Sequence, residues 1–333
     1  MTSISPTSVA APRRITIERI EEASRAIDPV FLRTPQWVCE PLGEELGIRI
    51  ALKGETLNPI RSFKGRGADW LVRNLPSGAA LMCASAGNFG QAMAYACRRR
   101  GVPLTVYAAT NGNPLKIARM RSLGAEVVLA GEDFDAAKGI ARAEAAQRGV
   151  RFVEDSRDPE PTEGAGTIGL EWLAFPERLD ALLVPLGNGA LLAGIATVVK
   201  ARRPGTRVIA VAATGAPAMV ESLQSGRLVQ HERIATIADG IGVRKPVPEA
   251  LADLTGLVDG FILVPDDATL DAMRLLHRHA GLVAEPSGAV GLAGAMQERE
   301  RFSGQTVGTV ICGGNLTQEQ MGEWLGGPGR PIP

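Results

Sequence analysis

Several features that mark common classes of protein are scarce in this sequence of 333 residues. Aromatic residues make up only 4%, and 36 Lys plus Arg balance 36 Asp plus Glu. The chain therefore offers neither the stacking surface nor the positive field that attracts nucleic acids or anionic membranes. No apolar run approaches the length needed to span a bilayer. We expect no nucleic-acid partner and no membrane association.

Metal-site spacing is also absent. Of three histidines, His277 and His279 are two apart on a predicted helix and point in different directions, which makes them poor joint ligands. No CxxC pair occurs among the four cysteines, Cys39, Cys83, Cys97 and Cys312. This pattern predicts no metal site and a reducing, cytoplasmic location. Residues 1–14 lack the apolar core of a secretion signal and are expected to form a flexible tail.

Short β-rich runs alternate with helical runs along most of the chain. The run 79–84 precedes a predicted helix over 88–100, and the apolar run 181–186 precedes one over 191–201. Gly-rich turns join them; one of these, 164–167, is expected to interrupt the pattern before a helix that ends at Trp172. The alternation predicts an α/β fold with parallel sheets covered by helices.

Lys64 has an unusual setting for a lysine. It lies between Phe63 and Gly65, after a proline-containing turn and before an amphipathic run. Small, apolar and turn-forming neighbours reduce hydration, which favours the neutral amine that attacks a carbonyl carbon. Taken alone, this stretch is better interpreted as an exposed lysine at the start of a helix, so its meaning depends on the other loops.

The loop Gly187-Asn188-Gly189-Ala190 lies between a strand and a helix. Small residues there expose N–H groups at a helix N-terminus, which is typical of an anion site. Leu192 occupies the third glycine position of GxGxxG, and no acidic residue ends the next strand at 212–214, so a dinucleotide is disfavoured. A glycine turn that only permits close packing is the competing interpretation.

Two further loops follow predicted strands. In Ser85-Ala86-Gly87-Asn88, the serine and the backbone N–H groups suit a carboxylate, although Asn88 alone is better interpreted as a helix N-cap. In Cys312-Gly313-Gly314-Asn315, a thiol stands at a strand end, where a small buried residue is the simpler interpretation. Strand ends meet at one edge of a parallel sheet. A lysine, a phosphate loop, a carboxylate site and a weak polar group together predict pyridoxal 5′-phosphate as cofactor.

These segments resemble, in order, motifs of the fold-type II pyridoxal-phosphate enzymes, specifically the threonine/serine dehydratase and serine racemase group. The likeness runs from about residue 17 to 317 and includes residues 62–68, 85–88, 164–167, 187–191, 238–240, 285–289 and 312–315. It implies two linked three-layer α/β domains with parallel sheets. The large cofactor-binding domain is expected over 15–70 plus 150–326, and a small mobile domain over 71–149. It also implies a homodimer without a C-terminal regulatory domain after Pro333.

The resemblance assigns roles to individual residues. Lys64 takes the Schiff-base position, and the catalytic set is Lys64, Ser85 and Asn88. The cofactor is expected to contact Phe63, Lys64, Asn88, Gly187, Asn188, Gly189, Ala190, Leu191 and Cys312. The amino-acid substrate is expected to contact Ser85, Ala86, Gly87, Asn88, Asp239 and Gly240.

Several positions depart from the family pattern. Asn188 and Ala190 replace glycines of the phosphate loop, and Arg61 stands where a glycine is common. Ala212 replaces a glutamate that helps bind a metal ion in some relatives. Ala86 stands where the racemase branch has a serine that acts as a second acid and base. We therefore expect Lys64 to be the one group that transfers protons, and the protein to be a lyase and not a racemase.

The expected reaction is β-elimination of a β-hydroxy amino acid such as L-threonine or L-serine to a 2-oxo acid and ammonia. A threonine-synthase-like reaction, β-replacement, or dehydration of a specialised β-hydroxy amino acid would use the same loops. A non-enzymatic amino-acid-binding module and an NAD oxidoreductase are weaker alternatives, because the lysine, serine and asparagine are all present and the dinucleotide fingerprint is not.

Overall fold

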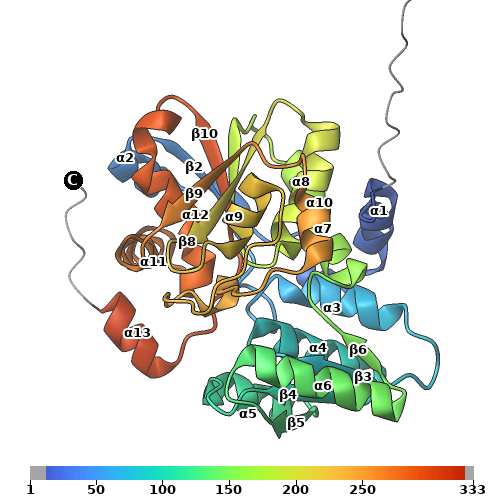
Figure 1. The fold of residues 1–333 in the computed structure, drawn as a ribbon. Helices are drawn as coiled ribbons and strands as arrows, with labels where there is room; N and C mark the ends of the chain where they lie inside the picture. The colour runs from blue at the N-terminus through green and yellow to red at the C-terminus, as the bar shows by residue number, and fades with distance from the viewer. Residues whose placement is uncertain (1–12, 327–333) are drawn as a thin grey trace, which may run out of the picture.

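The computed structural model describes residues 13–326 and contains two β-sheets in separate parts of the molecule (Figure 1). Most of the predicted tail, residues 1–12, lies outside the described residues. The six-stranded sheet has the order β1-β2-β10-β7-β8-β9, and only the β1–β2 pair is antiparallel. The four-stranded sheet has the order β5-β4-β3-β6 and is parallel throughout. The predicted α/β class with parallel sheets is confirmed.

The strands of the large sheet are β1 (Gln36–Val38), β2 (Arg49–Gly54), β7 (Ala181–Pro185), β8 (Arg207–Ala213), β9 (Gly260–Val264) and β10 (Thr306–Ile311). Apolar side chains are buried on both of its faces. One core lies against α2 (Glu40–Leu46), α11 (Asp266–Ala280) and α12 (Pro286–Gln297), and the other lies against α8 (Ala190–Arg202) and α10 (Pro248–Leu254). Burial on both faces explains why the central strands β7 and β8 are almost continuously apolar in the sequence.

The small sheet contains β3 (Leu81–Ala84), β4 (Leu104–Ala108), β5 (Glu126–Leu129) and β6 (Arg151–Val153). Helices α4 (Asn88–Arg100) and α5 (Pro114–Ser122) cover one face, and α6 (Phe134–Arg148) covers the other. Because β6 pairs with β3, residues 151–153 belong to this sheet, although we predicted the large domain from residue 150 onward. The division into domains and the mobility of the smaller one stay predictions.

Helix α3 (Lys64–Arg73) lies between the two sheets and packs on α7 (Pro159–Leu173) (Figure 1). The prediction that residues 164–167 interrupt the chain before a helix is wrong, because they lie within α7. A Cβ atom on Gly164 would approach the Gly67 Cα to 2.4 Å. Here the glycines permit close helix packing and do not end a helix.

The remaining helices are α1 (Ile17–Ala26), α9 (Ala218–Ser225) and α13 (Gln318–Leu325), with short 3₁₀ turns at Pro29–Phe31, Asp239–Ile241 and Arg299–Phe302. Thr317 and Gln320 form a reciprocal capping box at the start of α13. No helix in the described range 13–326 is long and apolar enough to cross a membrane.

Candidate active site

A cavity of about 440 Å³ lies where loops from both sheets meet. Its walls come from the ends of β3, β6, β7 and β10, the start of α3 and the turn Asp239–Ile241. Loops at the carboxyl ends of parallel strands converge in this way. Every predicted site residue lines this cavity: Phe63, Lys64, Ser85, Ala86, Gly87, Asn88, Gly187, Asn188, Gly189, Ala190, Leu191, Asp239, Gly240 and Cys312. The structure brings these residues together, and their individual roles stay predictions.

Lys64 is the first residue of α3, and its side chain is only 15% exposed. Backbone bonds tie its loop to the loop after β10: the Phe63 N–H donates to the Cys312 carbonyl (3.1 Å), and the Gly314 N–H donates to the Arg61 carbonyl (3.0 Å). The lysine loop and the cysteine loop are therefore held as one unit.

The Lys64 amine donates to the Asp155 carboxylate, with 2.5 Å between Nζ and Oδ2. The same nitrogen lies 4.5 Å from the centre of the Phe63 ring. The sequence analysis missed Asp155, although it follows the strand Arg151–Val153 and lies at a strand's carboxyl end, as the other candidate loops do. Applying the strand-end rule to residues 151–155 would have found it.

Ser85 and Asn88 have different tasks at the start of α4. The Ser85 hydroxyl oxygen accepts from the N–H groups of Gly87 (3.1 Å) and Gly90 (3.0 Å), which fixes the loop. Gly87 is the N-cap residue, so the interpretation of Asn88 as the cap is wrong. Asn88 instead donates from Nδ2 to the Glu285 carboxylate (2.5 Å) and accepts at Oδ1 from the Asn315 amide (2.9 Å).

Glu285 is a buried carboxyl group at the centre of a second charged cluster. Burial raises its pKa to about 7, and the neighbouring charge of Lys116, whose Nζ is 4.0 Å away, opposes that rise. Lys116 also donates to the Asp239 carboxylate at 2.8 Å. Asp239, a predicted substrate contact, thus has Lys116 as its ion-pair partner and links α5 to the turn Asp239–Ile241.

Cys312 lies at the end of β10 with its thiol buried. The Sγ atom donates to the Ser287 carbonyl at 3.4 Å, and burial raises the pKa of the Cys312 thiol far above its ordinary value. The group is therefore a neutral thiol and not a nucleophile.

The loop between β7 and α8 has the form of a phosphate cradle. Gly189 has a φ of +106°, and a Cβ atom on Gly187 would approach the Ile241 Cα to 3.0 Å. The α8 N-terminus directs backbone N–H groups toward this loop. One of these groups, that of Ala190, donates to the Ser156 hydroxyl at 3.2 Å.

Three buried side-chain oxygens of the cavity have no hydrogen-bond partner within residues 13–326: Asp155 Oδ1, Asn188 Oδ1 and Ser287 Oγ. Buried polar atoms are normally paired, so a group left open in a cavity indicates a polar ligand. The N–H groups of the glycine cradle suit a phosphate and the Lys64 amine suits an aldehyde, so the cavity fits a phosphorylated aldehyde cofactor.

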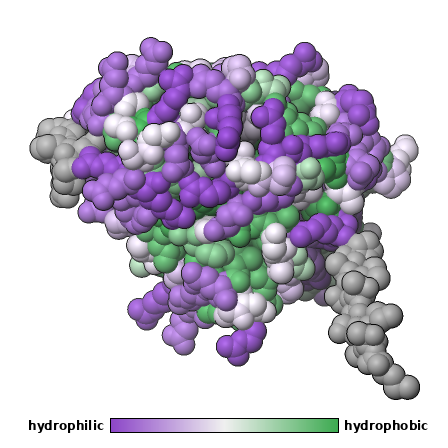
Figure 2. Space-filling model, turned by 90° about the horizontal axis from the view of Figure 1, so that it is seen from above, coloured by the Kyte–Doolittle hydropathy of each residue, from purple (hydrophilic) through white to green (hydrophobic). Residues whose placement is uncertain are grey.

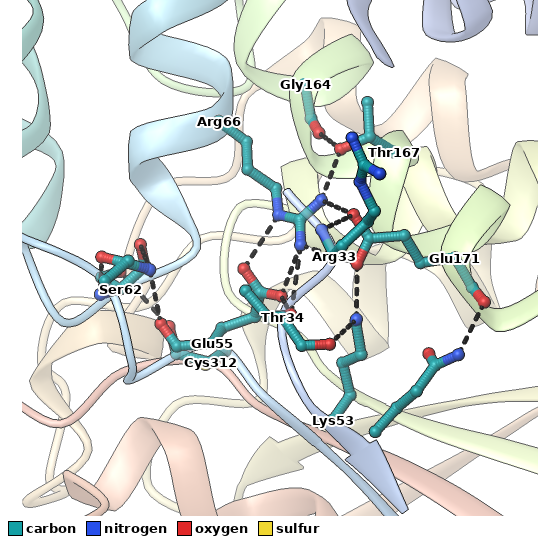
Figure 3. A network of polar contacts seen from close by, with 12 residues as sticks. Arg33, Thr34, Lys53, Glu55, Ser62, Arg66, Gly164, Thr167, Glu171 and Cys312 are labelled. Atoms are coloured by element: carbon teal, nitrogen blue, oxygen red, sulfur yellow. Dashed lines mark hydrogen bonds and ion pairs between the residues drawn. The ribbon is translucent and has the colours of Figure 1, made fainter. Parts of the chain in front are cut away.

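A buried ionic network surrounds Arg66, which follows Lys64 by two residues in α3 (Figure 3). The Arg66 guanidinium, which is fully buried, contacts Glu55 at 2.8 Å and Glu171 at 2.6 Å. Lys53 donates to the same Glu171 at 2.5 Å and to the Thr34 carbonyl at 2.7 Å. The network ties α3 to β2 and α7. No local pattern signals it, because the partners lie far apart in the chain.

Comparisons with known proteins agree with this geometry. Residues 27–313 match the family model described as pyridoxal-phosphate dependent enzyme. L-threonine ammonia-lyase of Thermotoga maritima is 36% identical over 305 residues, which are 91% of this chain and 76% of that protein. L-threonine ammonia-lyase of Geobacter sulfurreducens is 38% identical over 301 residues, or 89% and 75% of the two chains.

Solved structures extend the likeness to three dimensions. The threonine deaminase of T.th. has a TM-score of 0.85 at 36% identity and covers 91% of this chain and 99% of that one. Maize serine racemase has a TM-score of 0.87 at 26% identity, with 93% and 96% covered. The resemblance found in the sequence is thus confirmed. The chain belongs to the pyridoxal-phosphate dependent enzymes of fold type II, and pyridoxal 5′-phosphate is its cofactor.

Proposed function

We propose that this enzyme releases ammonia from a β-hydroxy amino acid, with L-threonine or L-serine as substrate and a 2-oxo acid as product. The water lost when the β-hydroxyl group is eliminated is taken up again when the resulting C=N bond is hydrolysed, so ammonia is the only group lost overall. The observation that carries the proposal is the cavity in which Lys64 meets the Ser85–Asn88 loop, the cradle of residues 187–191 and Cys312. The names of the relatives, L-threonine ammonia-lyase and L-threonine dehydratase, support this reaction at 30–38% identity.

In this proposal, Gly187, Asn188, Gly189, Ala190 and Leu191 bind the cofactor phosphate at the N-terminus of α8. Lys64 would hold the cofactor covalently, and Phe63, Asn88 and Cys312 would hold its ring. Bound pyridoxal phosphate supplies an electron sink for the negative charge that develops at the substrate Cα. The neutral thiol of Cys312 would place no negative charge beside the ring nitrogen, so that nitrogen would stay unprotonated, which favours elimination.

The substrate carboxylate is proposed to bind the loop 85–88 through the N–H groups of Ala86 and Asn88. Those of Ser85 and Gly87 hold the loop itself, because they donate to the Tyr107 carbonyl and to the Ser85 hydroxyl oxygen. The Lys64 amine would take the Cα proton as general base. Asp239 and Gly240, which also line the cavity, are proposed to contact the substrate. Ala86 carries no proton donor, so the reaction on this face ends in elimination and not in inversion.

The assembly and the location are also part of the proposal. Hydrophobic side chains gather toward the middle of the face seen from above, which supports self-association as a homodimer (Figure 2). We propose a cytoplasmic enzyme, because Cys39, Cys83, Cys97 and Cys312 are all buried free thiols.

The assignment of Lys64 is tested with Lys64→Ala. This variant should lose the absorbance of the covalently bound cofactor and at least about 1,000-fold in ammonia release, because the same amine holds the cofactor and moves the proton. Lys200→Ala, which removes a lysine that pairs with Asp259 away from the cavity, is the matched control and should keep both signals.

The reaction class is tested by assaying 2-oxo acid and ammonia with L-serine, L-threonine and bulkier or acidic β-hydroxy amino acids. Release of both products in equal amounts supports elimination. Product that retains the amino group, or turnover only with O-phosphohomoserine, would replace the proposal with β-replacement or a threonine-synthase-like reaction.

A further inference from the structure

Asp155 stands beside Lys64, and the reaction outlined above assigns it no task. Its Oδ2 atom accepts from the Lys64 amine at 2.5 Å, and its Oδ1 atom is buried without a partner among residues 13–326. The side chain is 24% exposed, so solvent screens the pair only partly. Asp155 lines the same cavity as the lysine.

The turn that carries Asp155 is fixed from several sides. The Asp158 carboxylate accepts from the Glu154 N–H at 2.7 Å, which closes the turn around residue 155. Ser156, next to Asp155, has a left-handed backbone with a φ of +66° and accepts from the Ala190 N–H. Such a conformation is costly for serine and persists only where its surroundings impose it. The contact with Lys64 therefore comes from a rigid turn that also touches the phosphate cradle.

Other charged groups of the cavity have their own partners. Lys138 pairs with Glu154 at 3.2 Å, and Lys116 pairs with Asp239 at 2.8 Å and faces Glu285 at 4.0 Å. Cys312 is held as a neutral thiol because burial raises its pKa. Of the ionisable groups that line the cavity in the described part of the chain, Asp155 is the one whose ion pair with Lys64 is within 4 Å.

We propose that Asp155 is a positioning residue for Lys64, which fixes the lysine nitrogen in the cavity and stabilises positive charge on it. When the neutral amine takes the Cα proton, the C–H electron pair stays on the substrate and the new ammonium donates to the Asp155 carboxylate. The proton taken from Cα thus stays on the Lys64 nitrogen. This inference rests on the proposed function, in which Lys64 binds the cofactor covalently.

The test is a pH titration of the absorbance of the bound cofactor, which reports the charge on the nitrogen that Lys64 contributes. A carboxylate in contact favours the protonated form, so Asp155→Asn should lower the midpoint by at least about one pH unit, a tenfold change in the proton equilibrium. Asp155→Glu restores the charge and should move the midpoint back toward the wild-type value. Asp155→Ser is measured beside them, so the result does not depend on one variant folding.

Two controls isolate the effect. Asp259→Asn breaks a different Lys–Asp pair, with Lys200, and should leave the midpoint unchanged. Because Glu285 titrates near pH 7, the comparison is repeated in a Glu285→Gln background, where the shift should persist.

The inference is overturned if the midpoint of folded Asp155→Asn lies within about 0.3 pH unit of the wild-type midpoint. It is also overturned if the midpoints of both proteins lie outside the range of about pH 5 to 10. A wild-type midpoint above that range with a variant midpoint inside it supports the inference. If the shift is found but no ammonia is released from any β-hydroxy amino acid, the proposed function fails and the role of Asp155 stands. If Lys64→Ala keeps the absorbance, both fail.

Discussion

Arg66 shows how one buried residue near Lys64 can matter without touching the cavity. Its guanidinium is 0% exposed and contacts the carboxylates of Glu55 and Glu171. Although burial acts to lower the pKa of Arg66, the attraction of these carboxylates outweighs it and raises that pKa. Removing one partner of a buried pair leaves an unpaired charge in a medium of low dielectric constant. The network therefore acts as a rigid support for the first turn of α3.

We predict that Arg66→Ala lowers the free energy of unfolding by about 3–5 kcal/mol. The matched control is Arg49→Ala: Arg49 also makes a two-point contact with a carboxylate, that of Glu177, but its side chain is 49% exposed. That substitution should leave the free energy of unfolding nearly unchanged, because solvent screens the exposed pair. Thermal unfolding of both variants checks the prediction, and equal losses would contradict it.

The backbone conformation at Arg61 bears on one departure from the family pattern. Its backbone has a φ of +51°, in the left-handed region that glycine adopts most easily. A glycine is common at this position in the family because the turn before Lys64 requires that conformation. Arginine meets the same requirement here at a conformational cost, while its side chain is exposed.

At the scale of elements, the crossing of α3 and α7 places Lys64 relative to the large sheet. The backbones approach so closely that a Cβ atom on Gly164 would lie 2.5 Å from the Gly67 nitrogen. Backbone atoms cannot move aside as a flexible side chain can. The separation of the two helices, and with it the position of the α3 N-terminus, depends on this glycine.

We predict that Gly164→Ala destabilises the protein by about 1–3 kcal/mol and weakens cofactor binding, because α3 must move away from α7. Gly139→Ala in α6 is the control, since a Cβ atom there meets nothing within 4 Å. That variant should be unchanged or more stable by up to about 1 kcal/mol, as expected for glycine to alanine in a helix. Unfolding midpoints and cofactor titrations of both variants test this. A destabilised Gly139→Ala beside an unaffected Gly164→Ala would refute the packing argument.

At the scale of the whole molecule, ion pairs join the part that holds the four-stranded sheet to the part that holds the six-stranded sheet. Lys116 of α5 pairs with Asp239, and Arg244 pairs with Asp133 at 3.0 Å and Asp135 at 2.5 Å, near the start of α6. The segment before Arg244 supplies Ile234, Thr236 and 239–243 to the cavity wall. If the smaller domain is mobile, as the sequence resemblance predicts, these pairs open and close with it.

We predict that Arg244→Ala raises amide exchange in residues 231–244 and increases KM several-fold, because one wall of the cavity loses its tie to α6. The Arg244 side chain is 26% exposed, so the free energy of unfolding should change by less than about 1 kcal/mol. Hydrogen exchange with and without the amino-acid substrate measures the first effect, and steady-state kinetics measures the second. Arg49→Ala again serves as control, and unchanged exchange in 231–244 would rule out the tie.

The class of fold and the loops that form the cavity follow from local patterns in the sequence. Continuously apolar strands, alternating helices and glycine turns are such patterns, and they predicted that the lysine, serine and cysteine loops meet with the cradle of residues 187–191. The same local reasoning failed for Gly164–Thr167, because a glycine that ends a helix and one that lets two helices touch look alike in a sequence.

Which side chains act on one another depends on the folded arrangement. Asp155 meets Lys64 across 91 residues, and Asn88 meets Glu285 across 197. Such contacts depend on how strands pair and on how each loop is held, which no local pattern specifies. The strand-end rule could have placed Asp155 at the cavity, but only the folded chain places its carboxylate 2.5 Å from the Lys64 nitrogen.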